Sequence, residues 1–116
     1  MQYMLMIYGD EEKMRAIPKE DMNKMMPAYT SYTEALKNAG ILRAGDRLQF
    51  SSNATTVRIR DGKTNVVNGP YAETKEQLAG FYIIDVPDVD SALSWAARCP
   101  GASMGTVEVR PIWAMQ

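Results

Sequence analysis

The chain has 116 residues and a mass of 13.0 kDa, a length that suits one domain with its own hydrophobic core. Its 13 Lys and Arg residues nearly balance 14 Asp and Glu residues, and the net charge of −1 argues against direct nucleic-acid or anionic-membrane binding as the main role. No apolar run approaches the roughly 20 residues that cross a bilayer, and the first residues lack a secretory pattern, so we expect a cytoplasmic protein.

Histidine is absent and Cys99 is the only cysteine. These counts exclude a Ser-His-Asp triad, a Cys-His pair, any His-containing metal site and an intramolecular disulfide. The nine methionines indicate adaptable packing, because thioethers without Cys or His make weak metal sites. We therefore expect no metal site and no cofactor, and we expect Cys99 to pack near the end of a helix.

The first predicted element is a strand over residues 2–8, apolar on both faces and therefore expected in the middle of a sheet. Pro18 opens a helical segment. Pro27 lacks a backbone donor and disfavours helical geometry at the preceding residue, so we expect a break or kink there, with the main helix starting at Pro27 and stopping at Gly40. The apolar stripe of the helical region is Met22, Met25, Met26, Tyr29, Tyr32, Thr33 and Leu36.

The middle of the chain predicts a β-hairpin. Residues 41–50 are extended but interrupted by Gly45, and residues 54–60 alternate apolar and charged side chains. Asp61-Gly62 is a strong signal for a two-residue turn, so residues 63–67 should return as the antiparallel partner strand.

The second half of the chain repeats the pattern of strand, helix and strand. Residues 80–86 are again apolar on both faces. Asp88 is suited to cap a helix that runs to Arg98 and ends before Pro100-Gly101, and residues 106–112 form the last strand. The expected buried stripe of this helix is Val89, Ala92, Leu93 and Ala96.

This order of elements predicts an α+β fold, ferredoxin-like βαββαβ with an added β-hairpin, in one domain over residues 1–116. The two doubly apolar strands should be central, with helices on one face of the sheet. The other face would keep an apolar centre with a charged margin, so we expect a homodimer that closes through it.

The segment Asn68-Gly69-Pro70-Tyr71-Ala72-Glu73-Thr74-Lys75-Glu76 resembles the signature of the YCII-related family, in its DGPF branch. Asn68 and Tyr71 replace the first and fourth letters of that name. Residues 4–10, 95–101 and 105–111 resemble the first strand, last helix and last strand of the family, so the resemblance covers nearly the whole chain. It implies a dimeric α/β barrel.

The resemblance also implies a cleft. The better-characterised branch of the family has a histidine near the start of the first long helix and an aspartate after the first strand, and the corresponding residues here are Tyr29 and Asp10. Tyrosine has an ordinary pKa of about 10, so Tyr29 is a poor base near neutrality but can donate a proton or orient a carbonyl. Alternatively, Tyr29 belongs only to the helix stripe and Asp10 to an acidic turn.

The signature adds ligand-binding candidates to this cleft. The turn at residues 69–70 fixes the backbone that presents Asn68 and Tyr71 as hydrogen-bond donors, with Glu73 as the proton acceptor. In the alternative interpretation this is a structural turn, in which Asn68 bonds its own backbone and Tyr71 packs.

Arg43 and Asp46 flank Gly45 and are the last candidates. They either line the same cleft as ligand-binding residues or form a surface ion pair.

Two classes of function follow. The first is a small-molecule-binding or regulatory protein, because members of the DGPF branch are associated with extracytoplasmic-function sigma factors and assist transcription control without binding DNA. The alternative is a cofactor-independent enzyme of lyase or isomerase type acting on a small polar or aromatic molecule. The absence of histidine and the loss of the signature aspartate at Asn68 favour binding. The expected partners are a second copy of the chain and a small-molecule ligand, with no nucleic acid and no membrane.

Overall fold

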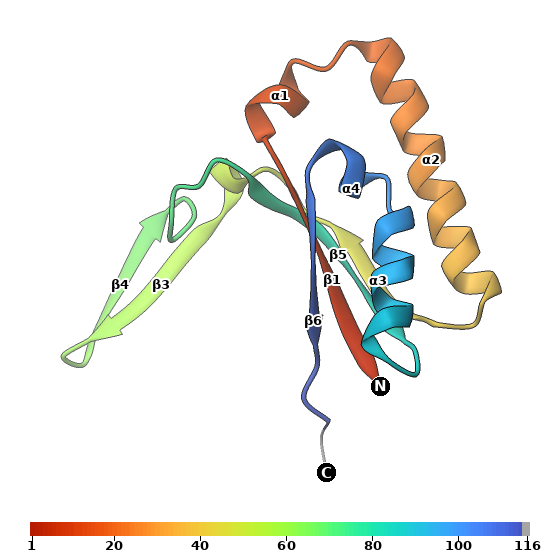
Figure 1. Cartoon of the computed structure of the whole chain (residues 1–116). Helices are drawn as coiled ribbons and strands as arrows, with labels where there is room; N and C mark the ends of the chain where they lie inside the picture. Colours follow the sequence, from red (N-terminus) through yellow and green to blue (C-terminus); the bar gives the residue numbers. More distant parts are fainter. Residues whose placement is uncertain (115–116) are drawn as a thin grey trace.

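The computed structural model describes residues 1–114. Four strands form the main antiparallel sheet in the order β2-β5-β1-β6 (Figure 1). Their bounds are β1 Gln2–Gly9, β2 Leu42–Arg47, β5 Gln77–Asp85 and β6 Thr106–Pro111. The central pair, β1 and β5, consists of the two doubly apolar strands, as the sequence predicted, and the α+β architecture is consistent with a ferredoxin-like fold.

The hydrophobic core lies between one face of this sheet and the helices. The helices are α1 Glu11–Arg15, α2 Lys19–Asn38, α3 Val89–Arg98 and α4 Gly101–Met104, and a 3-10 turn, η1, covers Ser51–Asn53. Tyr3, Leu5 and Ile7 alternate along β1 toward the helices and are buried. They pack in one cluster with residues of β5 and the helices: Tyr32, Leu36, Ile84, Val86, Ala92, Ala96 and Cys99.

Helix α2 begins at Lys19 and passes through Pro27 without ending. The expected start of the main helix at Pro27 is therefore wrong. Proline removes one intrahelical hydrogen bond, but the rest of this 20-residue helix remains bonded, and its buried residues Tyr32 and Leu36 attach it to the sheet. Tertiary packing outweighs the local preference.

Helix α3 has the predicted cap, since Asp88 accepts a hydrogen bond of 2.8 Å from the backbone N–H of Ser91. Its predicted stripe is only half right. Ala92 and Ala96 are buried, whereas Val89 and Leu93 are 47% and 49% exposed. The buried face of α3 runs along Ala92, Ala96 and Cys99. Val89 and Leu93 therefore lie at the margin of this face.

The second face of the sheet carries no helix. Alternation along the central strands places Met4 and Met6 of β1, with Phe81 and Ile83 of β5, on this side. These four residues, each partly buried in the single chain, are called the open face below.

Strands β3, Thr55–Arg60, and β4, Lys63–Asn68, form a two-stranded sheet of their own, called the arm. Asp61 and Gly62 both have positive φ, 53° and 74°, as a two-residue type I′ hairpin turn requires. The arm extends away from the body of the molecule (Figure 1). The radius of gyration is accordingly 16.2 Å, against about 13 Å for a compact chain of this length.

Candidate functional site

A pocket of about 590 Å³ lies between the first half of α2 and the end of the sheet where β1 ends and β5 begins. This volume is in the range of small-molecule sites. Most of its wall is apolar, contributed by α1 and the segment after it, α2, the sheet and α4: Ile7, Met14, Ile17, Met25, Met26 and Met104.

Gly101, at the start of α4, makes the back of this pocket possible. A Cβ atom at this position would lie 2.7 Å from Cγ2 of Ile7 and 2.7 Å from the hydroxyl oxygen of Tyr29. Both distances are too short for nonbonded contacts. The missing side chain therefore allows the Tyr29 hydroxyl to enter the space between α2, β1 and α4.

Tyr29, Thr33 and Tyr82, which carry hydroxyl groups, line the pocket. The Thr33 hydroxyl donates to the backbone carbonyl of Tyr29 over 2.9 Å and also lies 2.8 Å from the Tyr82 hydroxyl. Threonine has one hydroxyl proton, so Tyr82 must be the donor in the second bond. The Tyr82 oxygen then remains as an acceptor toward the pocket.

Burial raises the pKa of Tyr29 above its ordinary value, and the neighbouring Cys99 raises this pKa further. The phenol therefore stays protonated at neutral pH and acts as a hydrogen-bond donor rather than as a base. Burial likewise raises the pKa of the Cys99 thiol, which remains uncharged. Cys99 packs in the core at the end of α3, as its position in the sequence predicted.

Two cationic side chains, Lys13 of α1 and Arg47 of β2, also border the pocket. Among residues 1–114, neither forms an ion pair, and the nearest polar contact of Arg47 is a weak one, 4.0 Å from Nη1 to the Met26 sulfur. Arg47 pairs in register with Gly80, so its side chain starts on the helix-covered face.

Two aspartates, Asp10 and Asp46, also border the pocket. Asp10 caps α1, where one carboxylate oxygen accepts hydrogen bonds from the backbone N–H groups of Glu12 and Lys13 at 3.0 and 3.3 Å. Asp46 pairs in register with Phe81 and therefore starts on the open face. The pocket is thus lined by two cations and two carboxylates, and the cations, Lys13 and Arg47, form no ion pair among residues 1–114.

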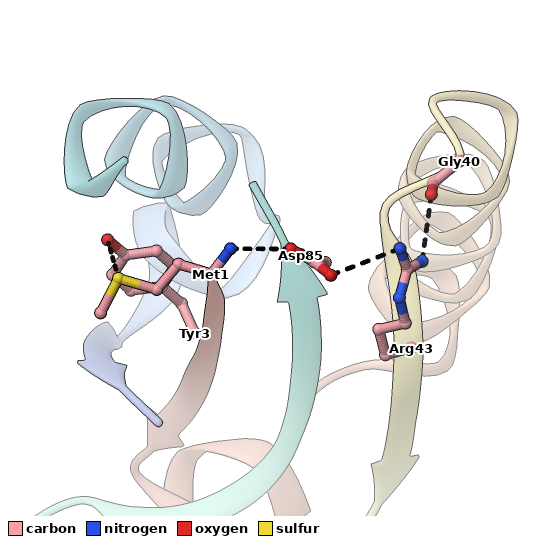
Figure 2. A network of polar contacts seen from close by, with 5 residues as sticks. All are labelled: Met1, Tyr3, Gly40, Arg43 and Asp85. Atoms are coloured by element: carbon pink, nitrogen blue, oxygen red, sulfur yellow. Dashed lines mark hydrogen bonds and ion pairs between the residues drawn. The ribbon is translucent and has the colours of Figure 1, made fainter. Parts of the chain in front are cut away.

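The structure brings together some of the residues that the sequence singled out. Asp10, Tyr29 and Asp46 all border the pocket. Arg43 does not: it lies 3.5 Å from Asp85 at the opposite end of β2 and β5 (Figure 2). The same aspartate accepts a hydrogen bond of 2.9 Å from the Met1 amino group, and together these contacts lower its pKa.

The signature residues Asn68, Tyr71 and Glu73 do not border the pocket of their own chain. All three are exposed, and Tyr71 is 77% exposed. The signature instead closes the base of the arm. The Gly69 backbone N–H donates to the Ala54 carbonyl over 2.7 Å, with Gly69 at a φ of 110° that strongly favours glycine. The convergence of both groups on one cleft is therefore not seen within a single chain.

Glu11 is a buried carboxylate, 6% exposed, that no local sequence pattern predicts. Glu11 accepts hydrogen bonds from both the backbone N–H and the hydroxyl of Ser51, at 2.7 and 2.5 Å. Its own N–H donates to the Gln77 side chain over 3.0 Å. Glu11 therefore ties α1, which borders the pocket, to η1 before the arm and to the start of β5.

Within the described residues, no helix is long and apolar enough to span a bilayer, and no three His, Cys, Asp or Glu side chains are grouped to hold a metal ion.

The α+β fold and the segment at residues 68–76 are both consistent with one family of small domains. Residues 1–116 match the YCII-related domain, and the chain belongs to this family. Over 114 residues it is 40% identical to an uncharacterised protein of Rhizobium meliloti (strain 1021), in an alignment that covers 97% of this chain and 92% of the relative.

Proposed function

We propose that this protein binds a small organic anion with an apolar or aromatic body in the pocket beneath α2. The observation that carries this proposal is the combination of an apolar pocket of about 590 Å³ with two cations, Lys13 and Arg47, that form no ion pair among residues 1–114. A carboxylate placed near them gains charge-assisted hydrogen bonds, while its body fills the apolar wall. Tyr29 adds a neutral donor.

Binding is favoured over proton-transfer chemistry because the two catalytic candidates in the pocket, Tyr29 and Asp10, are both otherwise engaged. Tyr29 holds its proton, and Asp10 is occupied as a helix cap. The alternative function, a cofactor-independent lyase or isomerase, would need one of these two groups, or Glu73 from elsewhere, to accept a proton during the reaction. Asp10 and Tyr29 border the same pocket, which keeps this alternative open to a direct test.

We further propose that the protein acts as a homodimer, a dimeric α/β barrel, closed through the open face. The apolar centre of this face is uncovered in the single chain, and a second copy of the same face covers it symmetrically. From its resemblance to the DGPF branch, we assign the protein to sigma-factor-dependent transcription control in the cytoplasm without direct contact with DNA. The free thiol of Cys99 fits a reducing compartment.

The ligand proposal is tested with four probes measured by calorimetry: benzoate and phenylacetate, and their uncharged amides. We expect at least one acid to bind with a Kd below about 1 mM and at least about tenfold more tightly than its amide. Arg47→Gln should remove this preference. Arg43→Gln is the matched control, because Arg43 lies on the same strand but pairs with Asp85 away from the pocket.

Equal binding of acid and amide, or equal losses in the two arginine variants, would contradict the proposal. NMR of each bound probe over a day separates the two functions. An unchanged probe supports a binding protein, and its conversion supports the enzyme.

A further inference from the structure

We infer that the apolar side of the arm docks on a second copy of this chain, so that each copy of the dimer clasps the other. The inference rests on the homodimer proposed above and extends it to a second, separate contact surface.

The arm has two unlike faces. Residues opposite each other in its ladder share a face, and one face carries Val57, Ile59 and Val66, which are 59%, 63% and 58% exposed. The other face carries charged and polar residues with one valine: Thr56, Arg58, Arg60, Lys63, Asn65 and Val67. This pattern is that of a ribbon with one side covered and the other in water.

Within the described residues the apolar side stays more than half exposed, and the arm forms a sheet of its own. An isolated two-stranded hairpin is at best marginally stable in water. A partner that covers its apolar side would therefore stabilise the arm. The radius of gyration of 16.2 Å reflects how far the arm extends from the core of its own chain.

The direction of the arm identifies the partner as a second copy. Figure 1 shows the helices α2 and α3 on one side of the main sheet and the arm leaving on the other side. A copy seated on the open face therefore occupies the space beside the arm. Two-fold symmetry then makes the contact reciprocal, with each arm lying along the other copy.

The area supports the same partner. A face of four strands, each about 20 Å long and spaced by about 4.8 Å, measures roughly 400 Å², so two such faces bury roughly 800 Å². Stable dimers bury about 1,200–2,000 Å² in total. Each arm, about 20 Å by 10 Å, covers roughly 200 Å² of itself and as much of its partner, and two arms bring the total to roughly 1,600 Å².

The test compares lysine substitutions on the two sides of the arm by analytical ultracentrifugation. Ile59→Lys places a charge on the apolar side, and Asn65→Lys places the same charge on the polar side. We expect Ile59→Lys to raise the dimer Kd by at least about 30-fold, as loss of a central interface contact does. We expect Asn65→Lys to change it by less than about threefold.

Met6→Lys, on the open face, separates the two dimer contacts. If Met6→Lys dissociates the dimer while Ile59→Lys leaves it unchanged, the arm inference is wrong and the open-face dimer stands. If the wild type is a monomer at micromolar concentration, both are wrong, while binding of benzoate in the pocket remains to be judged by its own titration.

Hydrogen exchange provides a measurement that needs no variant. In the wild-type dimer the amides of residues 55–68 should exchange much more slowly than in an unprotected peptide, and dilution to monomer should remove the protection. Full-speed exchange in the dimer would overturn the inference. So would tight binding of a 20-base-pair duplex DNA that Arg58→Gln abolishes, because it would assign the arm to nucleic acid.

Discussion

Removing the Glu11 carboxylate should be among the most destabilising single polar substitutions in this chain. Glu11→Ala removes two hydrogen bonds to Ser51 and leaves the Ser51 N–H without its acceptor. Bonds to a charged group contribute about 1.5–3 kcal/mol each, and some water will enter the space, so we expect a loss of about 3 kcal/mol. For a chain of this length that corresponds to a fall in Tm of about 12 °C.

The assay is thermal and urea unfolding followed by circular dichroism, with every variant at one protein concentration, because dimerisation shifts apparent stability. Glu12→Ala is the matched control, since Glu12 has the same charge in the next position but is exposed, and it should change stability by about 0.5 kcal/mol or less. Ser51→Ala keeps the backbone bond and should fall between the two variants.

A double-mutant cycle checks the cause. If the Glu11–Ser51 contact is responsible, adding Ser51→Ala to Glu11→Ala should cost little more than Glu11→Ala alone. A Glu11→Ala variant as stable as Glu12→Ala, or strictly additive effects in the cycle, would refute this reasoning.

Three further predictions address other parts of the fold. Burial raises the pKa of Tyr32, so its neutral form stabilises the fold fully below pH of about 10, and this contribution is lost as the pH rises further; Tyr32→Phe should reduce the alkaline loss of stability in urea unfolding between pH 8 and about 11. Gly101→Ala forces the Tyr29 hydroxyl to move and should cost about 1–3 kcal/mol while weakening benzoate binding measured by calorimetry. Hydrogen bonds from Ser91 lower the pKa of Asp88, so its stabilising effect is present above its ordinary pKa and is lost as the pH falls through the lowered value; Asp88→Asn should flatten the acid side of the stability profile, measured as Tm from pH 6 to about 2.

The sequence was sufficient for the sheet and the arm because both depend on short-range patterns. Apolar residues on both faces marked residues 2–8 and 80–86 as the central strands, and Asp61-Gly62 marked the hairpin turn. The error at Pro27 has the opposite origin. A local rule predicted the helix start. The helix continues because Tyr32 and Leu36, four residues apart on it, are buried by tertiary contacts.

The site was harder to predict because it depends on contacts between distant segments. The resemblance to the family proposed Asp10 and Tyr29 for one cleft, but it could not show that the Asp10 carboxylate caps α1. Arg47 could have been predicted as a pocket residue, because strand alternation places it on the same face of β2 as Gly45. Glu11 could not have been predicted in this way, because its partner Ser51 is forty positions away and nothing local marks the carboxylate as buried.

Binding of a small organic anion in the pocket beneath α2 can be followed residue by residue in amide NMR titrations of the protein with phenylacetate and with benzoate. We expect saturable shift changes concentrated at Tyr29, Arg47 and Gly101, with the signals around Arg43 unchanged. Saturable changes confined to the arm and the signature residues, or no saturable change with either acid up to about 5 mM, would contradict binding in this pocket.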